Sequence, residues 1–240
     1  MDYDKLIELA LRRGFFFPTA EIYNPIAGFW DYGPVGSALK RKVIELWRKE
    51  VVRKNGFVEI DGSATLPESV FSASGHLKNF VDPITECKKC GTVYRADKLI
   101  EEYLHEDVNE GTDPELLNKL LKKIKCPKCG GELSEVKKFN MMFKLKVGAK
   151  LDEVAYLRPE TCQSIFIDFP RVFKVMREKM PLGIAQVGKS FRNEISPRRS
   201  IVRMREFTQA EVEIFFIDNA DKIIEWGLNI IKSFFDKLGF

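Results

Sequence analysis

The sequence has no long hydrophobic run, and this absence limits the classes of protein to which it can belong. None of its apolar stretches reaches about 18 residues, the length that a helix needs to cross a bilayer. The first residues, MDYDKLIELALRRG, carry early acidic side chains and lack the apolar core of a secretory signal. We therefore expect neither a membrane span nor a signal peptide, and we expect a cytoplasmic protein.

A strong net charge is also absent. The 39 Lys and Arg residues against 35 Asp and Glu leave a formal net charge of +4. An excess of this size permits an RNA partner without demanding one, so the distribution of charge matters more than its sum. With 45% hydrophobic residues among 240, the chain has enough apolar side chains for one large globular domain or two smaller ones.

Cysteine is scarce, and four of the five cysteines fall into two pairs. Cys87-x-x-Cys90 and Cys126-x-x-Cys129 are each followed by glycine. In a chain without secretory features, such pairs are typical of metal ligands rather than of disulfides. Four thiolates form a closed tetrahedral site, which predicts structural zinc and disfavours catalytic zinc, because no coordination position stays open. The alternative is four buried cysteines without a metal.

Periodicity in the first part of the chain predicts two helices and a strand. A short amphipathic helix ends near Gly14, and residues 15–36, rich in aromatics, glycine and proline, suggest irregular structure. Apolar residues at helical spacing predict a second helix over 37–51, with Asn55-Gly56 as its stop. The segment 57–67 then predicts a strand that ends at a proline, which is typical of a sheet edge.

Beyond the first cysteine pair, the pattern predicts strands with flanking helices. Between the pairs, Asp113-Pro114-Glu115 is a helix start. We expect further helices at 160–176 and from Ile223 to Leu238, the last without a recognisable stop, and strands at 143–147, 155–157, 184–191 and 203–216. The last two strands are expected to form an antiparallel hairpin around the basic turn 196–200. Strands and helices in this order, without regular βαβ alternation, predict an α+β fold around an antiparallel sheet.

Basic and acidic residues gather at the ends of this predicted hairpin. Lys189 to Glu194 reads KSFRNE, and Arg203 to Phe207 reads RMREF. An arginine fork can hold a phosphate, a carboxylate can accept from an adenine amino group, and an aromatic ring can stack on the base. The same pattern also fits a solvated face of salt bridges, and the spacing alone does not decide between the two.

FRNE followed by R-x-x-x-F resembles motif 2 of class II aminoacyl-tRNA synthetases. The longer stretch GKSFRNEISPRRSIVRMREFTQAEVEIF is similar to glycyl-tRNA synthetases of the archaeal and eukaryotic type, as are EIYNPIAGFWDYGPVG, FSASGHLKNFVDPITEC and YRADKL. YLRPETCQSIF resembles the family's RPETAQG element and departs from it at Cys162 and Ser164, where small residues are usual. We interpret Cys162 as a packing residue. The resemblance covers essentially the whole chain and implies a class II synthetase-like antiparallel sheet flanked by helices, with an inserted zinc-ribbon-like module.

The resemblance implies ATP-dependent activation of glycine to glycyl-adenylate, with Mg²⁺, and transfer of glycine to tRNA(Gly). Arg192 is then expected to grip the α-phosphate and the glycine carboxylate, and Glu194 to meet the adenine end; these two are the implied catalytic residues. The implied ATP-binding residues are Arg192, Asn193, Glu194, Arg203 and Phe207, the last stacking on adenine. The implied glycine-binding residues are Arg158, Glu160, Gln163 and Glu211.

Glycine offers no side chain to bind, so selectivity has to come from charge pairing at its ammonium group and from a pocket too tight for a β-carbon. Glu160 and Glu211 resemble the carboxylates that surround this ammonium group. Because Glu211 and Glu213 lie on one predicted strand, a solvent-facing position is the alternative for one of them.

The resemblance divides the chain into three parts: residues 1–84 with motif 1, the zinc module 85–138, and residues 139–240 with the glycine element and motif 2. Motif 1, formed by the helix from Leu39 and the strand to Pro67, implies a homodimer. The sequence has no G-x-G-x-G-x-x-R element of motif 3 and no anticodon-binding domain. We therefore expect a C-terminal portion beyond this chain, and the activity of this piece alone stays open.

Two other functions remain as alternatives. A non-catalytic class II-like module that binds RNA or a partner chain is disfavoured by the intact Arg192, Glu194, Glu160 and Glu211. A synthetase for serine, proline or threonine is disfavoured by the paired carboxylates and the RPET phrase.

Four further residues attract attention without a clear role. Trp30 and Tyr32 are either core aromatics or contacts to substrate or tRNA. His76 and His105, the two histidines of the chain, have no partner at catalytic or ligand spacing, and we assign neither a function.

Overall fold

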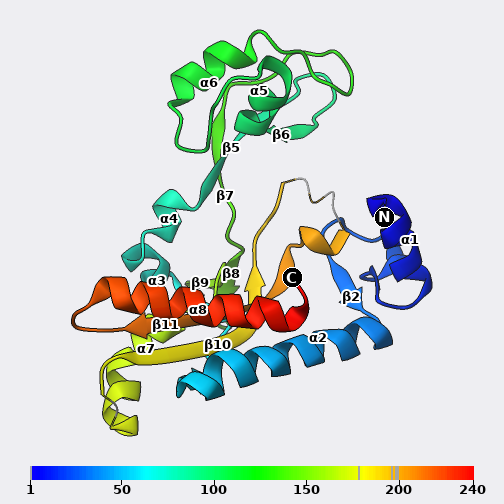
Figure 1. The fold of residues 1–240 in the computed structure, drawn as a ribbon. Coiled ribbons are helices and arrows are strands. Elements are labelled where there is room, and N and C mark those ends of the chain that lie inside the picture. The colour runs from blue at the N-terminus through cyan, green and yellow to red at the C-terminus, as the bar shows by residue number, and fades with distance from the viewer. Residues whose placement is uncertain (1, 178, 196, 198–199) are drawn as a thin grey trace.

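The computed structural model describes residues 2–177, 179–195, 197 and 200–240, which form a body and a protruding module (Figure 1). The helices are α1 (Tyr3–Arg12), α2 (Pro34–Trp47), α3 (Glu68–Ala73), α4 (His76–Asn79), α5 (Ala96–Leu104), α6 (Pro114–Leu121), α7 (Cys162–Met176) and α8 (Ala220–Leu238). The strands are β1 (Phe16–Pro18), β2 (Trp30–Tyr32), β3 (Val58–Ile60), β4 (Thr65–Pro67), β5 (Val81–Glu86), β6 (Val93–Arg95), β7 (Lys137–Asn140), β8 (Lys144–Val147), β9 (Glu153–Leu157), β10 (Leu182–Phe191) and β11 (Glu206–Phe215). Within the described ranges, no helix is both long and apolar enough to cross a bilayer.

The hairpin of β10 and β11 is the centre of the body. Its strands pair antiparallel over their full lengths, from Leu182 opposite Phe215 to Phe191 opposite Glu206. β3 adds to the other edge of β10 in parallel, so the sheet has the order β11-β10-β3. The predicted α+β fold is confirmed, and the parallel β3 is a local exception to its antiparallel pairing.

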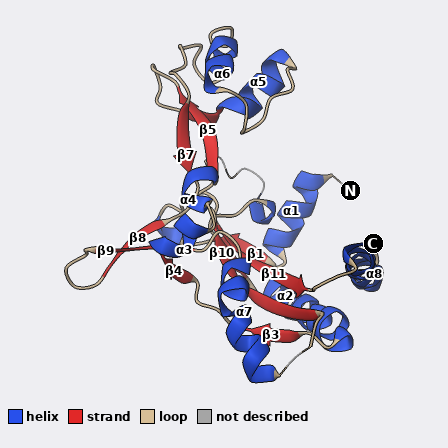
Figure 2. Cartoon of the chain, turned by 90° about the vertical axis from the view of Figure 1, so that its left-hand side faces the viewer, coloured by secondary structure: helices blue, strands red, loops and turns tan. Residues whose placement is uncertain are grey.

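Helices cover both faces of this sheet. Successive side chains of β10 point to opposite faces, so neighbouring residues contact different helices. Ile184 packs against Ile165 of α7, and Figure 2 shows α7 beside the strands. Its neighbour Ala185 packs on the other face with Trp47 at the end of α2 and Ile230 of α8. Both Ile184 and Ala185 are fully buried. The hairpin is therefore fixed from two sides before it reaches its far end.

A second antiparallel sheet, of order β4-β9-β8, lies next to the hairpin. The short helices α3 and α4 pack on it through Phe71, which is fully buried against Met142 and Tyr156. Leu77 and Phe80 complete this small core. As a result, the loop between α3 and α4 lies close to the residues that directly follow β9.

The protruding module stands on a two-stranded stem of β5 and β7, which Figure 1 shows rising from the body. β6 pairs with the other edge of β5, and α5 and α6 lie at the tip. The module has its own hydrophobic core, in which Leu99 and Ile100 of α5 meet Leu117, Leu120 and Leu121 of α6. The module therefore has an apolar core separate from those of the body.

Several predicted boundaries were wrong for identifiable reasons. The second helix begins at Pro34 rather than at residue 37, because Pro34 occupies the first helical position after Gly33. The predicted strand 57–67 is two strands, β3 and β4, which belong to different sheets. The final helix does have a stop, since Gly239 adopts φ 89° and its N–H donates to the carbonyl of Asp236.

The predicted hairpin is confirmed, with a shorter second strand. β11 begins at Glu206 rather than at residue 203, because Arg203 lies in the connecting loop, where its guanidinium bonds Glu194. Of the predicted basic turn 196–200, residues 196, 198 and 199 lie outside the described residues.

The packing of β10 predicts a large effect from a single truncation. Ile184→Ala removes most of a side chain that is 0% exposed, and we expect it to lower the free energy of unfolding by about 2–5 kcal/mol. Urea denaturation followed by tryptophan fluorescence measures this change. Ile217→Ala is the matched control, because Ile217 is 84% exposed. Equal midpoints for the two variants would contradict the assignment of β10 as the central strand.

Candidate active site and metal centre

Arg192 lies just beyond β10, at the far end of the hairpin. Its backbone N–H donates to the carbonyl of Arg205 at 2.9 Å, which closes the hairpin end. Its guanidinium lies between two aromatic rings, 5.5 Å from the centroid of Phe80 and 5.3 Å from that of Phe207. Nε donates to the carbonyl of Pro159 at 3.1 Å. Across the described chain, no hydrogen bond or ion pair engages the two terminal nitrogens, so they are available to an anion.

Glu194 is bound by the arginines of the loop that follows it. Its Oε2 accepts from Arg203 Nε at 2.7 Å and lies 2.6 Å from Arg203 Nη2. Its backbone carbonyl accepts from Arg205 Nε and Nη2 at 3.1 and 2.8 Å. Arg205 Nη1 also donates to the carbonyl of Ala27 at 2.6 Å. Glu194 is buried, and its pairing with Arg203 fixes the orientation of its carboxylate.

Arg158 directly follows β9. It is 2% exposed, and its guanidinium donates to the carbonyls of Gly62, Ser63 and Lys189 at 2.8, 3.2 and 2.8 Å. A β-carbon on Gly188 would lie 2.0 Å from Arg158 Nη2, so only glycine, which has no side chain, fits at this position of the strand. Arg158 therefore joins separate backbone segments underneath the site.

Glu160 lies between β9 and the start of α7, and it receives three donated hydrogen bonds. The donors are His76 Nε2 at 3.0 Å, Cys162 Sγ at 3.0 Å and Gln163 Nε2 at 2.7 Å. Burial raises the pKa of Glu160, but the hydrogen bonds from Cys162 and Gln163 and the proximity of His76 outweigh it. The pKa of Glu160 therefore lies below its ordinary value, and the carboxylate is ionised at neutral pH.

Glu211 points from β11 toward the same place. Oε2 accepts from the backbone N–H of Thr161 at 2.8 Å and from its hydroxyl, and Oε1 accepts from Gln209 at 2.8 Å. Two residues further on, Glu213 is half-buried, and its pKa is raised by burial and by the charges of Glu211 and Glu160. Three carboxylates thus lie near the N-terminal end of α7, and their charges favour a cation there.

Sequence reasoning missed the role of His76. The structure places His76 against Glu160, 84 positions further along the chain. Cys162 was interpreted as a packing residue, which is incomplete because its thiol donates to the same carboxylate oxygen. The sequence offered one indication that His76 belongs to the site, which is its position inside the block FSASGHLKNF. The spacing of residues gave no such indication.

These residues line a cavity of about 570 Å³, whose walls include Ser74, His76, Glu160, Cys162 and Gln163. Gln163 is 4% exposed, and its Oε1 is buried without a hydrogen-bond partner. A larger, mostly apolar cavity of about 680 Å³ lies between α2, β11 and α8, and its lining contains none of these carboxylates. The smaller cavity is therefore the one that the carboxylate of Glu160 borders.

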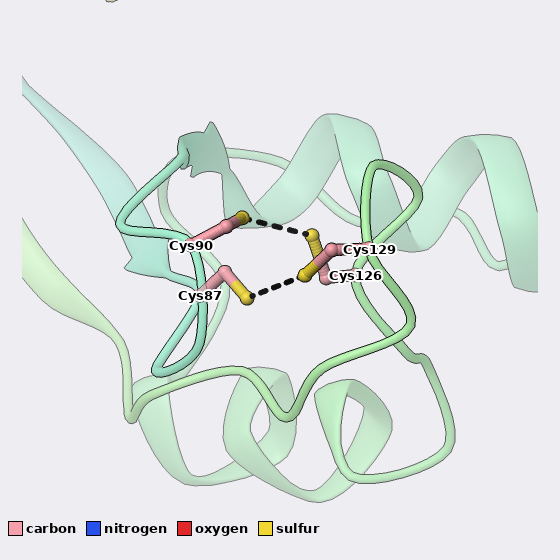
Figure 3. Close-up of side chains that lie close together, drawn as sticks. All are labelled: Cys87, Cys90, Cys126 and Cys129. Carbon is pink, nitrogen blue, oxygen red and sulfur yellow. Dashed lines mark hydrogen bonds between the residues drawn. The ribbon is translucent and has the colours of Figure 1, made fainter.

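The four paired cysteines converge in the protruding module (Figure 3). Their sulfur atoms all lie within 4.8 Å of one another, with 3.5 Å between Cys87 and Cys129 and 3.8 Å between Cys90 and Cys126. A tetrahedral zinc with Zn–S bonds of about 2.3 Å requires sulfur atoms about 3.8 Å apart. All four thiols are free. The cluster can hold a metal ion, in agreement with the predicted ligand set.

Two tight turns and a glycine shape this cluster. The N–H groups of Gly91 and Gly130 donate to the carbonyls of Cys87 and Cys126 at 2.9 and 2.8 Å, and both glycines have positive φ. A β-carbon on Gly131 would lie 3.0 Å from the sulfur of Cys87. Positive φ therefore favours glycine at positions 91 and 130, and the approach of the sulfurs favours it at position 131.

Comparison with known proteins supplies independent information. Residues 143–240 match the tRNA synthetase class II core domain (G, H, P, S and T). The chain is 51% identical over 222 residues to a glycine–tRNA ligase of Methanococcus maripaludis, a match that covers 92% of this chain and 38% of that protein. It is 52% identical over 219 residues to the glycine–tRNA ligase of Pyrococcus furiosus, covering 90% of this chain and 38% of that protein. The chain thus spans well under half the length of these relatives.

Solved structures with a similar fold are more distant in sequence. The RNA binding domain of threonyl-tRNA synthetase from Cryptosporidium parvum matches 97% of this chain with a TM-score of 0.59 and 18% identity, over 41% of its own length. The prolyl-tRNA synthetase of Giardia lamblia matches 89% of this chain with a TM-score of 0.55 and 18% identity, over 32% of its own length. These similarities confirm the class II synthetase-like fold.

The raised pKa of Glu213 predicts a stabilising substitution. Burial and two neighbouring carboxylates raise this pKa, so the charged form destabilises the folded state at neutral pH. The penalty disappears as the pH falls below the ordinary pKa of glutamate, about 4.3, because the residue is then neutral in both states. We expect Glu213→Gln to have a higher melting temperature than the parent at pH 7.5, with the difference vanishing near pH 3.5.

Glu225→Gln is the control, since Glu225 is an exposed residue of α8. Differential scanning calorimetry at several pH values measures both variants. A lower melting temperature for Glu213→Gln at neutral pH would show that its charge is paired in the folded protein, contrary to the crowding described above.

Proposed function

Because this chain is homologous to glycine–tRNA ligases over most of its length and carries a class II tRNA synthetase core, we propose that it forms the glycine- and ATP-binding part of a glycine–tRNA ligase. The complete protein then activates glycine with ATP and transfers it to tRNA(Gly). One observation carries the proposal: Arg192 is hydrogen-bonded to Pro159, the residue next to Glu160. The guanidinium of Arg192 is thus anchored to the backbone next to Glu160, and we assign the carboxylate of glycine to Arg192 and its ammonium group to Glu160.

The nucleotide lies at the end of the hairpin. The free terminal nitrogens of Arg192 grip the α-phosphate and the glycine carboxylate, and Phe207 offers a ring on which adenine stacks. Glu194, oriented by Arg203, accepts from the adenine amino group. Asn193 lies between Arg192 and Glu194 in the chain. A carboxylate oxygen of glycine attacks the α-phosphorus, pyrophosphate leaves, and Arg192 stabilises the charge that develops on the phosphoryl group.

The ammonium group of glycine lies at the carboxylates in front of α7. Glu160 accepts from it, Glu211 and Gln163 border the same site, and Arg158 supports it from beneath. The residues hold an ionised carboxylate and a buried amide oxygen without a donor, and an ammonium group supplies donors for both. In the second step a terminal ribose hydroxyl of the tRNA attacks the activated carbonyl carbon, and AMP leaves.

Mg²⁺ accompanies ATP in class II synthetases, and when bound it neutralises phosphate charge during pyrophosphate departure. Zinc is the metal that the cysteine cluster fits best, because four thiolates in tetrahedral arrangement leave no open position. Its role in this proposal is structural.

The proposal also includes the division into 1–84, 85–138 and 139–240, a homodimer through motif 1, and a cytoplasmic location. The exposed apolar residues Val35 and Leu39 on α2 support the dimer. A C-terminal portion with motif 3 and an anticodon-binding domain completes the enzyme.

Isothermal titration with glycyl-sulfamoyl adenosine, a stable mimic of the adenylate, tests the proposal. We expect the glycyl compound to bind at least about tenfold more tightly than the alanyl compound, because one misplaced methyl group in a tight pocket has an effect of this size. Arg192→Ala should weaken binding about 100-fold through loss of charge-assisted hydrogen bonds. Arg171→Ala is the control, since Arg171 is exposed on α7.

Two outcomes would contradict the proposal. Equal binding of the glycyl and alanyl compounds would assign the pocket to another amino acid. Absence of binding in a folded, metal-loaded chain would show that these 240 residues do not form the pocket without the C-terminal portion of the enzyme.

The metal centre gives a separate prediction. We expect one zinc per chain by elemental analysis, and Cys126→Ser should lose most of it, because a hydroxyl is a far weaker zinc ligand than a thiolate. Removal of zinc should loosen the module without unfolding the body, which has separate hydrophobic cores. Hydrogen exchange measures this local effect. Cys162→Ser is the control and should keep its zinc, whereas zinc-free protein with four reactive thiols would disprove the site.

A further inference from the structure

The carboxylate of Glu160 is held through one oxygen only. Oε1 accepts from His76, Cys162 and Gln163 at distances between 2.7 and 3.0 Å. Within the part of the chain that the structure describes, no hydrogen bond reaches Oε2. A carboxylate fixed in this way presents its second oxygen in one direction.

We propose that His76 is a positioning residue for the glycine site: by holding Oε1 of Glu160, it aims Oε2 at the ammonium group of the substrate. The inference rests on the proposed function, because it assigns the ammonium group to Glu160. It adds a residue on a different element, α4, to those that the sequence pattern suggested. His76 itself does not touch the reacting atoms.

The imidazole of His76 has defined roles at both nitrogens. Glu160 is ionised and can only accept, so the hydrogen between them belongs to His76 Nε2. In the neutral ring, Nδ1 is then an acceptor, and the hydroxyl of Ser74 lies 2.8 Å from it and can donate. Glu160 therefore requires the N–H at Nε2, and the hydroxyl of Ser74 is compatible with that tautomer.

Aromatic rings hold His76 in place. The ring of Phe71 is 6.1 Å away at an interplanar angle of 73°, and that of Phe80 is 5.7 Å away. Phe80 also contacts the guanidinium of Arg192. The same ring therefore borders the residue that orients Glu160 and the arginine proposed to bind the phosphate.

The local sequence explains how His76 reaches this position. Gly75 adopts φ 79°, a conformation that favours glycine, and it separates α3 from α4. The turn reverses the chain directly before His76 and brings its side chain to the start of α7. A residue with a β-carbon at position 75 would be strained there.

The kinetic test uses glycine-dependent exchange of pyrophosphate into ATP by the complete enzyme. We expect His76→Ala to raise the KM for glycine about tenfold or more, as for loss of a hydrogen bond to a charged group, and to leave the KM for ATP unchanged. His76→Gln should recover most of the loss, because its terminal amide N–H can reach the place of Nε2. His105→Asn is the control, since His105 is exposed in the protruding module and Asn tolerates its positive φ.

Two kinetic results would overturn the proposal. One is a glycine KM for His76→Ala equal to that of His105→Asn. The other is a parallel rise of both KM values without recovery in His76→Gln, which would mean that His76 only stabilises the fold.

A second measurement does not depend on activity. The chain contains two histidines, so ¹⁵N spectra of their side chains are readily assigned with His105→Asn. We expect His76 as the Nε2–H tautomer, with a change of its signals in Glu160→Gln; the Nδ1–H tautomer would disprove the proposal. If the complete parent enzyme shows no glycine-dependent exchange, the proposed function fails and the positioning role fails with it, even where the spectra confirm the His76–Glu160 contact.

Discussion

The guanidinium of Arg158 is almost completely buried, and it donates hydrogen bonds to backbone carbonyls of Gly62, Ser63 and Lys189. A buried cation is tolerated only when its donors are satisfied, so the segment before β4, the end of β9 and β10 are held at fixed positions around it. Gly188 provides the space that the guanidinium needs. The rest of the site depends on this arrangement, because Pro159 and Glu160 follow Arg158 directly.

Among the described residues, Arg192 and Glu160 form no ion pair with each other. Arg192 is bonded to the carbonyl of Pro159 through Nε, and the carboxylate of Glu160 is bonded to neutral donors. Each therefore keeps unpaired bonding capacity on the side that is open to a ligand. A zwitterion whose charges are one carbon apart matches this pattern, whereas a direct ion pair between Arg192 and Glu160 would have consumed it.

Features that depend on local spacing were predictable from the sequence. The cysteine pairs with their glycines, the two strands of the hairpin and the helix at Asp113 each carry their signal within a few residues. Features that depend on distant contacts were not. No spacing rule relates His76 to Glu160, and the parallel pairing of β3 with β10 joins segments separated by two other sheets. The stop at Gly239 carried little signal for a different reason, because Gly239 is the penultimate residue and only Phe240 follows it.

The two departures from the RPETAQG pattern, Cys162 and Ser164, each have a structural role. The thiol of Cys162 supplies one of the three donors to Glu160, which an alanine cannot do. Ser164 is 4% exposed, and a β-carbon on Gly62 would meet its side chain at 2.4 Å, so the extra atoms of serine are accommodated because position 62 is glycine. Substitution of a small residue by a larger one in a packed interior requires space nearby. The bulk added at Ser164 is thus directed toward Gly62, and the bulk added at Cys162 is directed toward Glu160, where it helps to hold the carboxylate.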